Sequence, residues 1–290
     1  MKKVADSELI INPDGSIFHL HMRPGQLGKT VFLVGDPARV EMISGFFEEV
    51  LYQGANREFV WKTGLFKGSE VTALSTGIGT DNIDIVLNEL DALVNFDFKT
   101  RMPKNAHTSL DIIRIGTSGS LQKDVPVDSW VLSKKAVGLD GLLNFYKKDE
   151  RYFDSDFQKA ITDYTGIGEG ISLPYVVDSS LRLFEKINSG EVISGATVTA
   201  PGFYGPQGRV LRLPVAKSDI NQKLASFRYK GLKLLNYEME CSAIYGLSAL
   251  LGHNAVTVCA IIANRAAGLY SKDYKVGVKK MTKYVLESLI

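Results

Sequence analysis

The residue of this sequence best suited to anion chemistry is Arg114, which interrupts an apolar run. Residues 111–115 hold three isoleucines, which predicts a strand buried on both faces, and the small residues 116–119 then predict a loop that can approach an anion closely. A guanidinium inside a buried strand is costly unless an anion pairs with it. Two interpretations stay open on this stretch alone: an internal ion pair with an Asp or Glu, or a phosphate site with Arg114 and Thr117 as donors.

A second group of chemically useful residues is the acidic pair Glu238 and Glu240. The pair follows a short apolar stretch and precedes a helical pattern, so we expect it at a strand-to-helix junction. Carboxylates there can complement the positive end of a helix, an effect of a few tenths to about 1 kcal/mol. They are also good acceptors for sugar hydroxyls. Arg39, Arg57 and Arg265 also fall near the ends of expected strands, which together favours a ligand with an anion and vicinal hydroxyls.

Strand and helix patterns alternate along the chain. Strands are expected at 31–34, 59–66, 70–75, 111–115, 130–137, 171–177, 192–199, 233–236 and 255–263. Helices are expected at 37–46, 83–96, 154–164, 239–251 and 275–289, with a further helix to 187 capped by residues 178–180. The alternation predicts the α/β class, as a single domain over residues 1–290 with a mixed, largely parallel central sheet flanked by helices. Ligands bind such sheets outside the carboxyl ends of strands, where the candidate residues fall.

Composition restricts the class of protein. The 290 residues include 34 basic and 32 acidic side chains, a net charge of +2, which argues against a nucleic-acid-coating protein. Cys241 and Cys259 lie in apolar surroundings without CxxC spacing, typical of reduced core residues in a cytoplasmic protein. No apolar run follows Lys2 and Lys3, and the run at 255–263 is too short to span a bilayer. We therefore expect neither a signal peptide nor a membrane partner.

The sequence resembles the nucleoside phosphorylase family of the hexameric purine and uridine type over nearly its whole length. Eight motifs in the family's order carry this resemblance: Phe18-His19-Leu20, Gly35-Asp36-Pro37-Ala38-Arg39-Val40, Arg57-Glu58-Phe59, Ser75-Thr76-Gly77-Ile78-Gly79, Arg114-Ile115-Gly116-Thr117-Ser118-Gly119, Phe203-Tyr204 with Gln207 and Arg209, Asn236-Tyr237-Glu238-Met239-Glu240, and Asn264-Arg265. The resemblance implies a pentosyltransferase that acts on a nucleoside and inorganic phosphate, with uridine as the expected nucleoside.

The resemblance also assigns a role to each candidate residue. The phosphate-binding residues it implies are Gly35, Arg39, Arg114 and Thr117, joined by Arg57 of a neighbouring subunit. The ribose-binding residues are Met239, Glu240 and Arg114, with His19 arriving from the same neighbour. The base-binding residues are Phe203, Gln207, Arg209, Glu238, Ile262, Ala263 and Arg265. Arg114, Glu240, Gln207 and Arg209 are the expected catalytic set, and a homodimer or homohexamer with shared active sites is the expected assembly.

The chemistry of phosphorolysis agrees with these residue types. Arginines suit a multiply charged nucleophile, and an amide beside a guanidinium suits charge on a leaving base. We expect no cofactor besides phosphate as co-substrate, and no metal, because His19 and His21 have no matching ligand cluster in the sequence. The family also suggests a monovalent cation near Glu58, Ile78 and Asn82, but Asn82 replaces a hydroxyl residue.

Two departures from the family pattern and several rival functions stay open. Segment 95–109 is longer than in compact bacterial relatives, and loop 202–209 has its glycine and proline interchanged, which leaves the choice among uridine, deoxyuridine and thymidine open. His107 and His253 are expected as surface or loop residues.

Purine phosphorolysis is disfavoured by Asn264, where purine enzymes of this type place an aspartate. A nucleosidase, a non-catalytic nucleoside-binding protein and a dinucleotide oxidoreductase with a broken glycine fingerprint at 76–82 are the other rivals.

Overall fold

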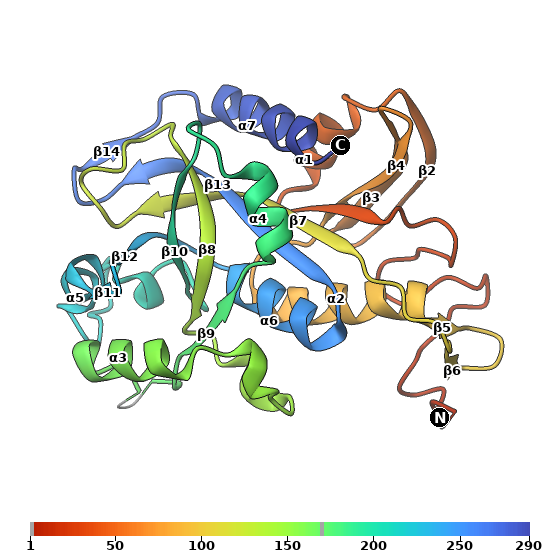
Figure 1. The fold of residues 1–290 in the computed structure, drawn as a ribbon, viewed down its shortest axis with the longest axis horizontal. Coiled ribbons are helices and arrows are strands. Elements are labelled where there is room, and N and C mark those ends of the chain that lie inside the picture. The colour runs from red at the N-terminus through yellow and green to blue at the C-terminus, as the bar shows by residue number, and fades with distance from the viewer. Residues whose placement is uncertain (1–2, 169–170) are drawn as a thin grey trace.

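The computed structural model describes residues 3–168 and 171–290 of the chain (Figure 1). Lys2, which entered the signal-peptide argument, lies outside the described residues. The strands are β1 (Thr30–Val34), β2 (Glu49–Asn56), β3 (Phe59–Phe66), β4 (Ser69–Ser75), β5 (Phe96–Asp97), β6 (Met102–Pro103), β7 (Asp111–Ser120), β8 (Trp130–Gly138), β9 (Tyr175–Asp178), β10 (Ile193–Thr199), β11 (Arg228–Tyr229), β12 (Leu232–Glu238), β13 (Asn254–Asn264) and β14 (Leu269–Tyr270). The helices are α1 (Pro37–Ser44), α2 (Thr80–Asn95), α3 (Ser155–Thr165), α4 (Leu181–Ile187), α5 (Ile220–Ser226), α6 (Cys241–Leu251) and α7 (Tyr274–Leu289), with 3-10 turns η1 (Leu142–Phe145), η2 (Glu150–Tyr152) and η3 (Gly205–Gln207).

One mixed sheet organises the fold, as predicted. Its strand order is β11-β12-β10-β8-β13-β7-β1-β4-β3-β2, with β9 beside β8 and β14 beside β13. Strands β4, β1, β7 and β13 are parallel to one another, as are β8, β10 and β12, but the two groups run in opposite directions. Because β12 also pairs with β7, the strands β7, β13, β8, β10 and β12 close into a ring. The carboxyl ends of β7 and β12 therefore overlap, with Tyr237 opposite Gly119.

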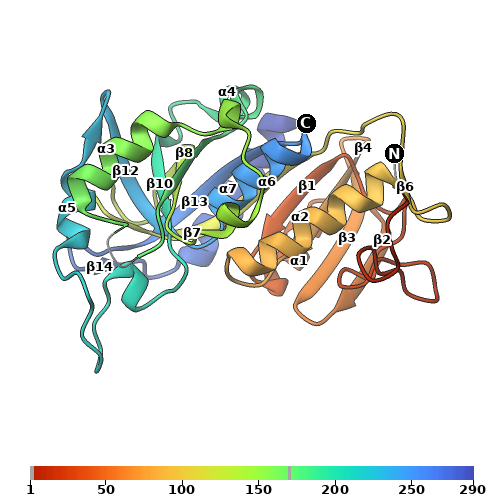
Figure 2. The ribbon, with the colours of Figure 1, turned by 90° about the horizontal axis from the view of Figure 1, so that it is seen from below.

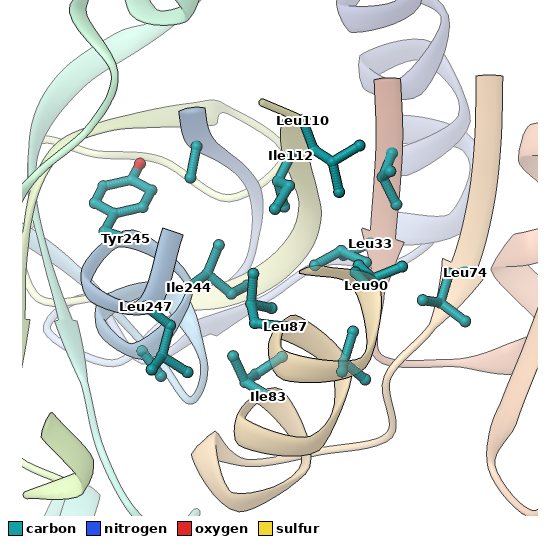
Figure 3. Close-up of a cluster of buried hydrophobic side chains, with 14 of the residues drawn as sticks. Leu33, Leu74, Ile83, Leu87, Leu90, Leu110, Ile112, Ile244, Tyr245 and Leu247 are labelled. Atoms are coloured by element: carbon teal, nitrogen blue, oxygen red, sulfur yellow. The ribbon is translucent and has the colours of Figure 1, made fainter. Parts of the chain in front are cut away.

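Both faces of the central strands are covered, which explains their continuous apolar runs. On one face, Leu33 and Ile112 pack with α2 and α6, as Figure 3 shows. On the other face, Phe32 and Ile113 belong to a cluster that includes Met281 of α7. Figure 2 shows α2 and α6 lying beside each other across the sheet, with α7 behind it. The amino-terminal ends of α2 and α6 come together beside the ring of strands, which places the two expected glycine and acidic loops in contact.

Several elements differ from expectation. Strand β7 runs through Ser120, so the loop expected at 116–119 is part of the strand and pairs with β13. Helix α5 and the short strands β5, β6, β11 and β14 were not predicted. Strand β2 was not predicted, because it is an edge strand whose residues are mostly exposed and show no apolar alternation. Strand β9 begins at Tyr175 instead of 171, since Pro174 cannot donate to the ladder. Helix α1 ends at Ser44, two residues early, where Gly45 caps it through its own amide.

The long segment 95–109 forms a small hairpin, with β5 paired to β6. Asn95 closes its base, because its side chain donates to the carbonyl of Thr108 at 3.1 Å and accepts from the amide of Thr108 at 2.7 Å. His253 is a loop residue as expected, but it is buried beneath this segment, with Nδ1 accepting from the amide of Leu110. None of the helices in residues 3–168 and 171–290 is long and apolar enough to cross a membrane.

Candidate active site

A cavity of about 730 Å³ lies where the carboxyl ends of β1, β7, β12 and β13 meet. It gathers all of the predicted phosphate, ribose and base residues except His19 and Arg57. Its size is typical of a small-molecule site. Polar groups at both ends of the cavity come from segments far apart in the sequence, and the overlap of β7 with β12 brings them together.

Arg114 forms the internal ion pair that one of the two sequence interpretations predicted. Its Nη2 donates to Oε2 of Glu240 and lies 3.3 Å from Oε2 of Glu238. Its Nη1 donates to the sulfur of Cys259 at 3.2 Å. Burial would lower the pKa of Arg114, but the carboxylates of Glu240 and Glu238 raise it well above the usual value. The guanidinium is therefore charged and fixed in orientation at the wall of the cavity.

Gly116 makes room for this guanidinium. A Cβ at position 116 would lie 2.0 Å from Nη1 of Arg114 and 2.6 Å from the sulfur of Cys259. Real atoms do not approach so closely, so any side chain at position 116 must displace Arg114. The glycine after the apolar run is thus required by the arginine inside that run.

The second cation of this end, Arg39, lies in the first turn of α1. Asp36 caps the helix by accepting from the amide of Ala38 at 2.9 Å, and Pro37 occupies the first helical position, as predicted. The Nη1 of Arg39 donates to the carbonyl of Ile115 at 3.0 Å. Burial and the neighbouring charge of Arg114 lower the pKa of Arg39. Two like charges held near each other favour an anion between them.

The acidic pair at the start of α6 divides into two roles. Glu238 accepts from the amides of Glu240 and Cys241 at 2.8 Å each, which satisfies the first donors of the helix as the simpler interpretation expected. Glu240 instead faces the glycine loop, where its Oε1 accepts from the amide of Gly79 at 2.8 Å. Both carboxylates contact Arg114, so one buried cation lies beside two acids.

The opposite end of the cavity is built by loop 200–209. Gln207 is buried, and its Oε1 accepts from Nη1 of Arg209 at 2.5 Å. The guanidinium of Arg209 also stacks on the ring of Phe203, 3.7 Å from its centre. Arg265 holds the loop from below by donating to the carbonyls of Gln207 and Gly208. An amide and two guanidiniums therefore face one region, together with Ile262 and Ala263 of β13.

His19 and Arg57 lie outside the cavity of their own chain. Glu89 of α2 anchors His19, accepting from its ring Nδ1 at 2.7 Å and from its amide at 3.0 Å. Arg57 is exposed in the two-residue turn between β2 and β3, in a left-handed conformation with φ of 54°. The neighbouring Asn56 donates to the carbonyl of His19 at 2.8 Å, so the two segments lie side by side.

The positions suggested for cations have protein partners of their own. Asn82 Nδ2 donates to Oε1 of Glu58 at 3.1 Å and to the carbonyl of Thr76 at 2.9 Å, while Ile78 is exposed. Among the described residues, the grouping with metal-ligand types is Asp91, His107 and His253. The Nδ1 of His253 accepts from a backbone amide, so its Nε2 carries the ring proton. This Nε2 lies 3.3 Å from Oδ1 of Asp91 without forming a hydrogen bond. A metal ligand has the reverse arrangement, with a free lone pair at Nε2, so we interpret the group as an anchor for segment 95–109.

The cavity also includes residues that sequence reasoning did not select. Tyr237, Gly119 and Tyr270 line it. Tyr237 and Gly119 lay inside quoted motifs, and only the antiparallel pairing of β12 with β7 shows that they meet. Tyr270 belongs to β14, a two-residue strand that has no sequence signal.

Comparisons with known proteins agree with this geometry. The phosphorylase superfamily model matches residues 29–289, and the chain belongs to that superfamily. It is 26% identical to a uridine phosphorylase of Thermococcus kodakarensis, covering 94% of this chain and 86% of that protein. It is also 26% identical to a DeoD-type purine nucleoside phosphorylase of Colwellia psychrerythraea, covering 94% of this chain and 98% of that one. The solved structure of a Trypanosoma brucei nucleoside phosphorylase, described as showing uridine phosphorylase activity, superimposes with a TM-score of 0.87 at 29% identity, covering 97% of this chain and 99% of that one.

Proposed function

We propose that this protein catalyses the reversible phosphorolysis of uridine to uracil and ribose 1-phosphate, as a pentosyltransferase of pyrimidine salvage. The observation that carries the proposal is the division of one cavity into an arginine end, with Arg39 and Arg114, and a base end with Gln207 and Arg209. Relatives named as uridine phosphorylases support it. Phosphate is the co-substrate and the reaction needs no cofactor.

The mechanism follows from where charge develops. Phosphate held by Arg39, Arg114, Thr117 and the amide of Gly35 attacks the anomeric carbon of the ribose as the bond to the base breaks. The sugar becomes positive, which the Glu240 carboxylate stabilises while it holds the ribose hydroxyls. The leaving uracil becomes negative, and donors placed in advance on that ring lower the barrier. No covalent intermediate is needed, because phosphate is itself the nucleophile.

Charge at the arginine end supports a site shared between two subunits. Within the cavity, Arg39 and Arg114 face the carboxylates of Asp36, Glu238 and Glu240, so one chain offers a phosphate dianion no excess positive charge there. An additional guanidinium offsets this balance and favours binding of the dianion. We assign it to Arg57 of a neighbouring subunit, with His19 of the same neighbour reaching the ribose. A dimer, within a hexamer, is then the active unit, and the reduced, buried cysteines suit the cytoplasm.

Purine phosphorolysis is the nearest alternative, because DeoD-type purine enzymes match the chain equally well in identity. The side chain of Asn264 argues against it. Its Nδ2 donates to the carbonyls of Gln122 and Val125, and its Oδ1 accepts from the amide of Ala267. This buried amide holds a loop and carries no acidic proton for a purine ring.

A nucleoside panel tests the proposed function. The purified protein is incubated with uridine, deoxyuridine, thymidine, cytidine, inosine and adenosine, each with and without phosphate, and the free base is measured. We expect uracil release that depends on phosphate. Equal turnover of inosine and uridine would reject the base assignment, base release without phosphate would indicate a nucleosidase, and no release at all would indicate a nucleoside-binding protein.

A further inference from the structure

The carboxylate of Glu238 is fully buried and accepts three hydrogen bonds from the protein. Its Oε1 accepts from the hydroxyl of Thr199 at 2.5 Å, and its Oε2 accepts from two backbone amides at 2.8 Å each. Nη2 of Arg114 lies 3.3 Å from the same Oε2, and the Glu238 side chain has no exposed surface. A carboxylate offers about four acceptor sites. Three hydrogen bonds and one ion-pair contact from the protein therefore engage this carboxylate before any substrate arrives.

We propose that Glu238 is a positioning residue, oriented by Thr199, that holds Arg114 for phosphate and does not read the base. This inference deepens the proposed phosphorolysis and rests on it. The resemblance to the family had placed Glu238 with the base residues. The reason for the different assignment is that its side chain has no exposed surface and protein donors contact both of its oxygens.

Thr199 is suited to this task by its position and by the direction of its single proton. It ends β10 directly beside Glu238, which ends β12. The amide of Ser242 donates to Oγ1 of Thr199 at 2.9 Å, so the hydroxyl proton is left to point at Glu238. The Ser242 hydroxyl in turn donates to Asp140 at 2.9 Å. A buried chain of hydrogen bonds thus fixes the carboxylate that faces Arg114.

The charge of Glu238 links this arrangement to pH. Burial raises the pKa of Glu238, and the charge of Arg114 opposes that rise. The titratable groups that face it are Arg114 of β7, Tyr175 of β9, Cys259 of β13, and Glu240 and Cys241 at the start of α6. Glu238 supports Arg114 in its ionised form, beside Glu240, so the activity that depends on this support is present above the pKa of Glu238 and is lost as pH falls through it. Removing the Thr199 hydroxyl removes a hydrogen-bond donor to the charged form of Glu238, which raises the pKa of Glu238. The low-pH side of the activity profile, the acid limb, then moves to higher pH.

The test compares Thr199→Val and Thr199→Ser with the unmodified protein. Uracil release is measured across pH at varied phosphate and varied uridine. We expect Thr199→Val to raise the KM for phosphate about 10- to 100-fold, the effect of one hydrogen bond to a charged group, and to shift the acid limb upward. The KM for uridine and the ratio of uridine to inosine turnover stay unchanged. Thr199→Ser keeps the hydroxyl, so its KM for phosphate and its acid limb stay close to those of the unmodified protein.

Thr197→Val is the matched control. Thr197 is buried on the same strand and donates to Asn236 at 2.8 Å, away from Glu238, so its loss lowers the melting temperature without moving the acid limb. A Thr199→Val protein with normal phosphate KM and an unmoved acid limb, or with altered base preference instead, would overturn the inference. If the unmodified protein releases no uracil, the proposed function fails, and calorimetric phosphate binding to the unmodified and Thr199→Val proteins still tests the positioning of Arg114 by itself.

Discussion

At the residue scale, the candidate site depends on space as much as on charge. Arg114 contacts two carboxylates and a sulfur because position 116 has no side chain. Burial raises the pKa of Cys259 to about 11, so this sulfur stays a neutral thiol that can accept from the guanidinium. A guanidinium placed in this way needs little reorganisation when phosphate binds, which is how preorganised donors contribute to catalysis.

Gly116→Ala is expected to lower uridine turnover about 100-fold, because the added methyl displaces the Arg114 guanidinium without removing any charge. The measurement is kcat/KM at a temperature well below the melting transition of the variant. Gly190→Ala is the control, since a Cβ there meets nothing within 4 Å. Activity within a few-fold of the unmodified protein would show that Arg114 acts from another position.

Gln207→Ala is expected to depress uridine turnover far more than phosphate affinity. The substitution removes the acceptor that holds Arg209 and leaves the arginine end untouched. Sites that hydrogen-bond a substrate lose discrimination when such a partner is missing. Kinetics at varied phosphate and varied uridine separate the two effects. A larger change in the phosphate KM than in kcat would contradict the base assignment.

Sequence reasoning found these residues but not their partners. A charged residue inside an apolar strand is costly, so Arg114 and the acids at 238 and 240 were conspicuous, and thirteen predicted site residues do meet in one cavity. Whether Arg114 pairs with an acid or with phosphate depends on contacts between β7 and β12, more than a hundred residues apart. Spacing along the chain carries no information on that pairing.

At the element scale, the sequence pattern again predicted some parts of the structure and not others. Buried strands and long helices were predicted well because each has one strong period, whereas edge strand β2 and the two-residue strands bury too little to leave a pattern. Segment 95–109 shows how such a piece is ordered by individual hydrogen bonds instead. Asn95 and the buried His253 hold its two ends.

Asn95→Ala is expected to loosen this hairpin without altering turnover. The substitution removes three hydrogen bonds, to Asp91 and to both backbone groups of Thr108, at a cost of about 1–3 kcal/mol for groups left unpaired. Hydrogen exchange should accelerate over residues 96–109, while uracil release stays constant. Unchanged exchange there would mean that other contacts anchor the segment.

At the scale of the whole molecule, the proposed sharing of Arg57 can be tested by mixing two inactive proteins. Arg57→Ala and Arg114→Ala are co-expressed or refolded together. In a mixed dimer, one site receives Arg114 from one chain and Arg57 from the other, while the second site lacks both. Random pairing makes about half of the dimers mixed, so roughly a quarter of normal activity should return. A mixture that stays inactive although mixed dimers form would place Arg57 in the site of its own chain.

Helix α2 has a consequence for how such sites would fill. The amide of its N-cap residue, Gly79, donates to Glu240 inside the cavity, while Glu89 further along the helix accepts from His19. A ribose hydroxyl that donates to Glu240 competes with the Gly79 amide for the same carboxylate. Nucleoside binding therefore changes a contact at the amino-terminal end of α2, a helix about 24 Å long. In the proposed assembly, Glu89 in the second half of the same helix supports the histidine delivered to the neighbour. If the sites are shared in this way, we expect occupancy of one site to alter the neighbouring one, so that the pair binds nucleoside cooperatively.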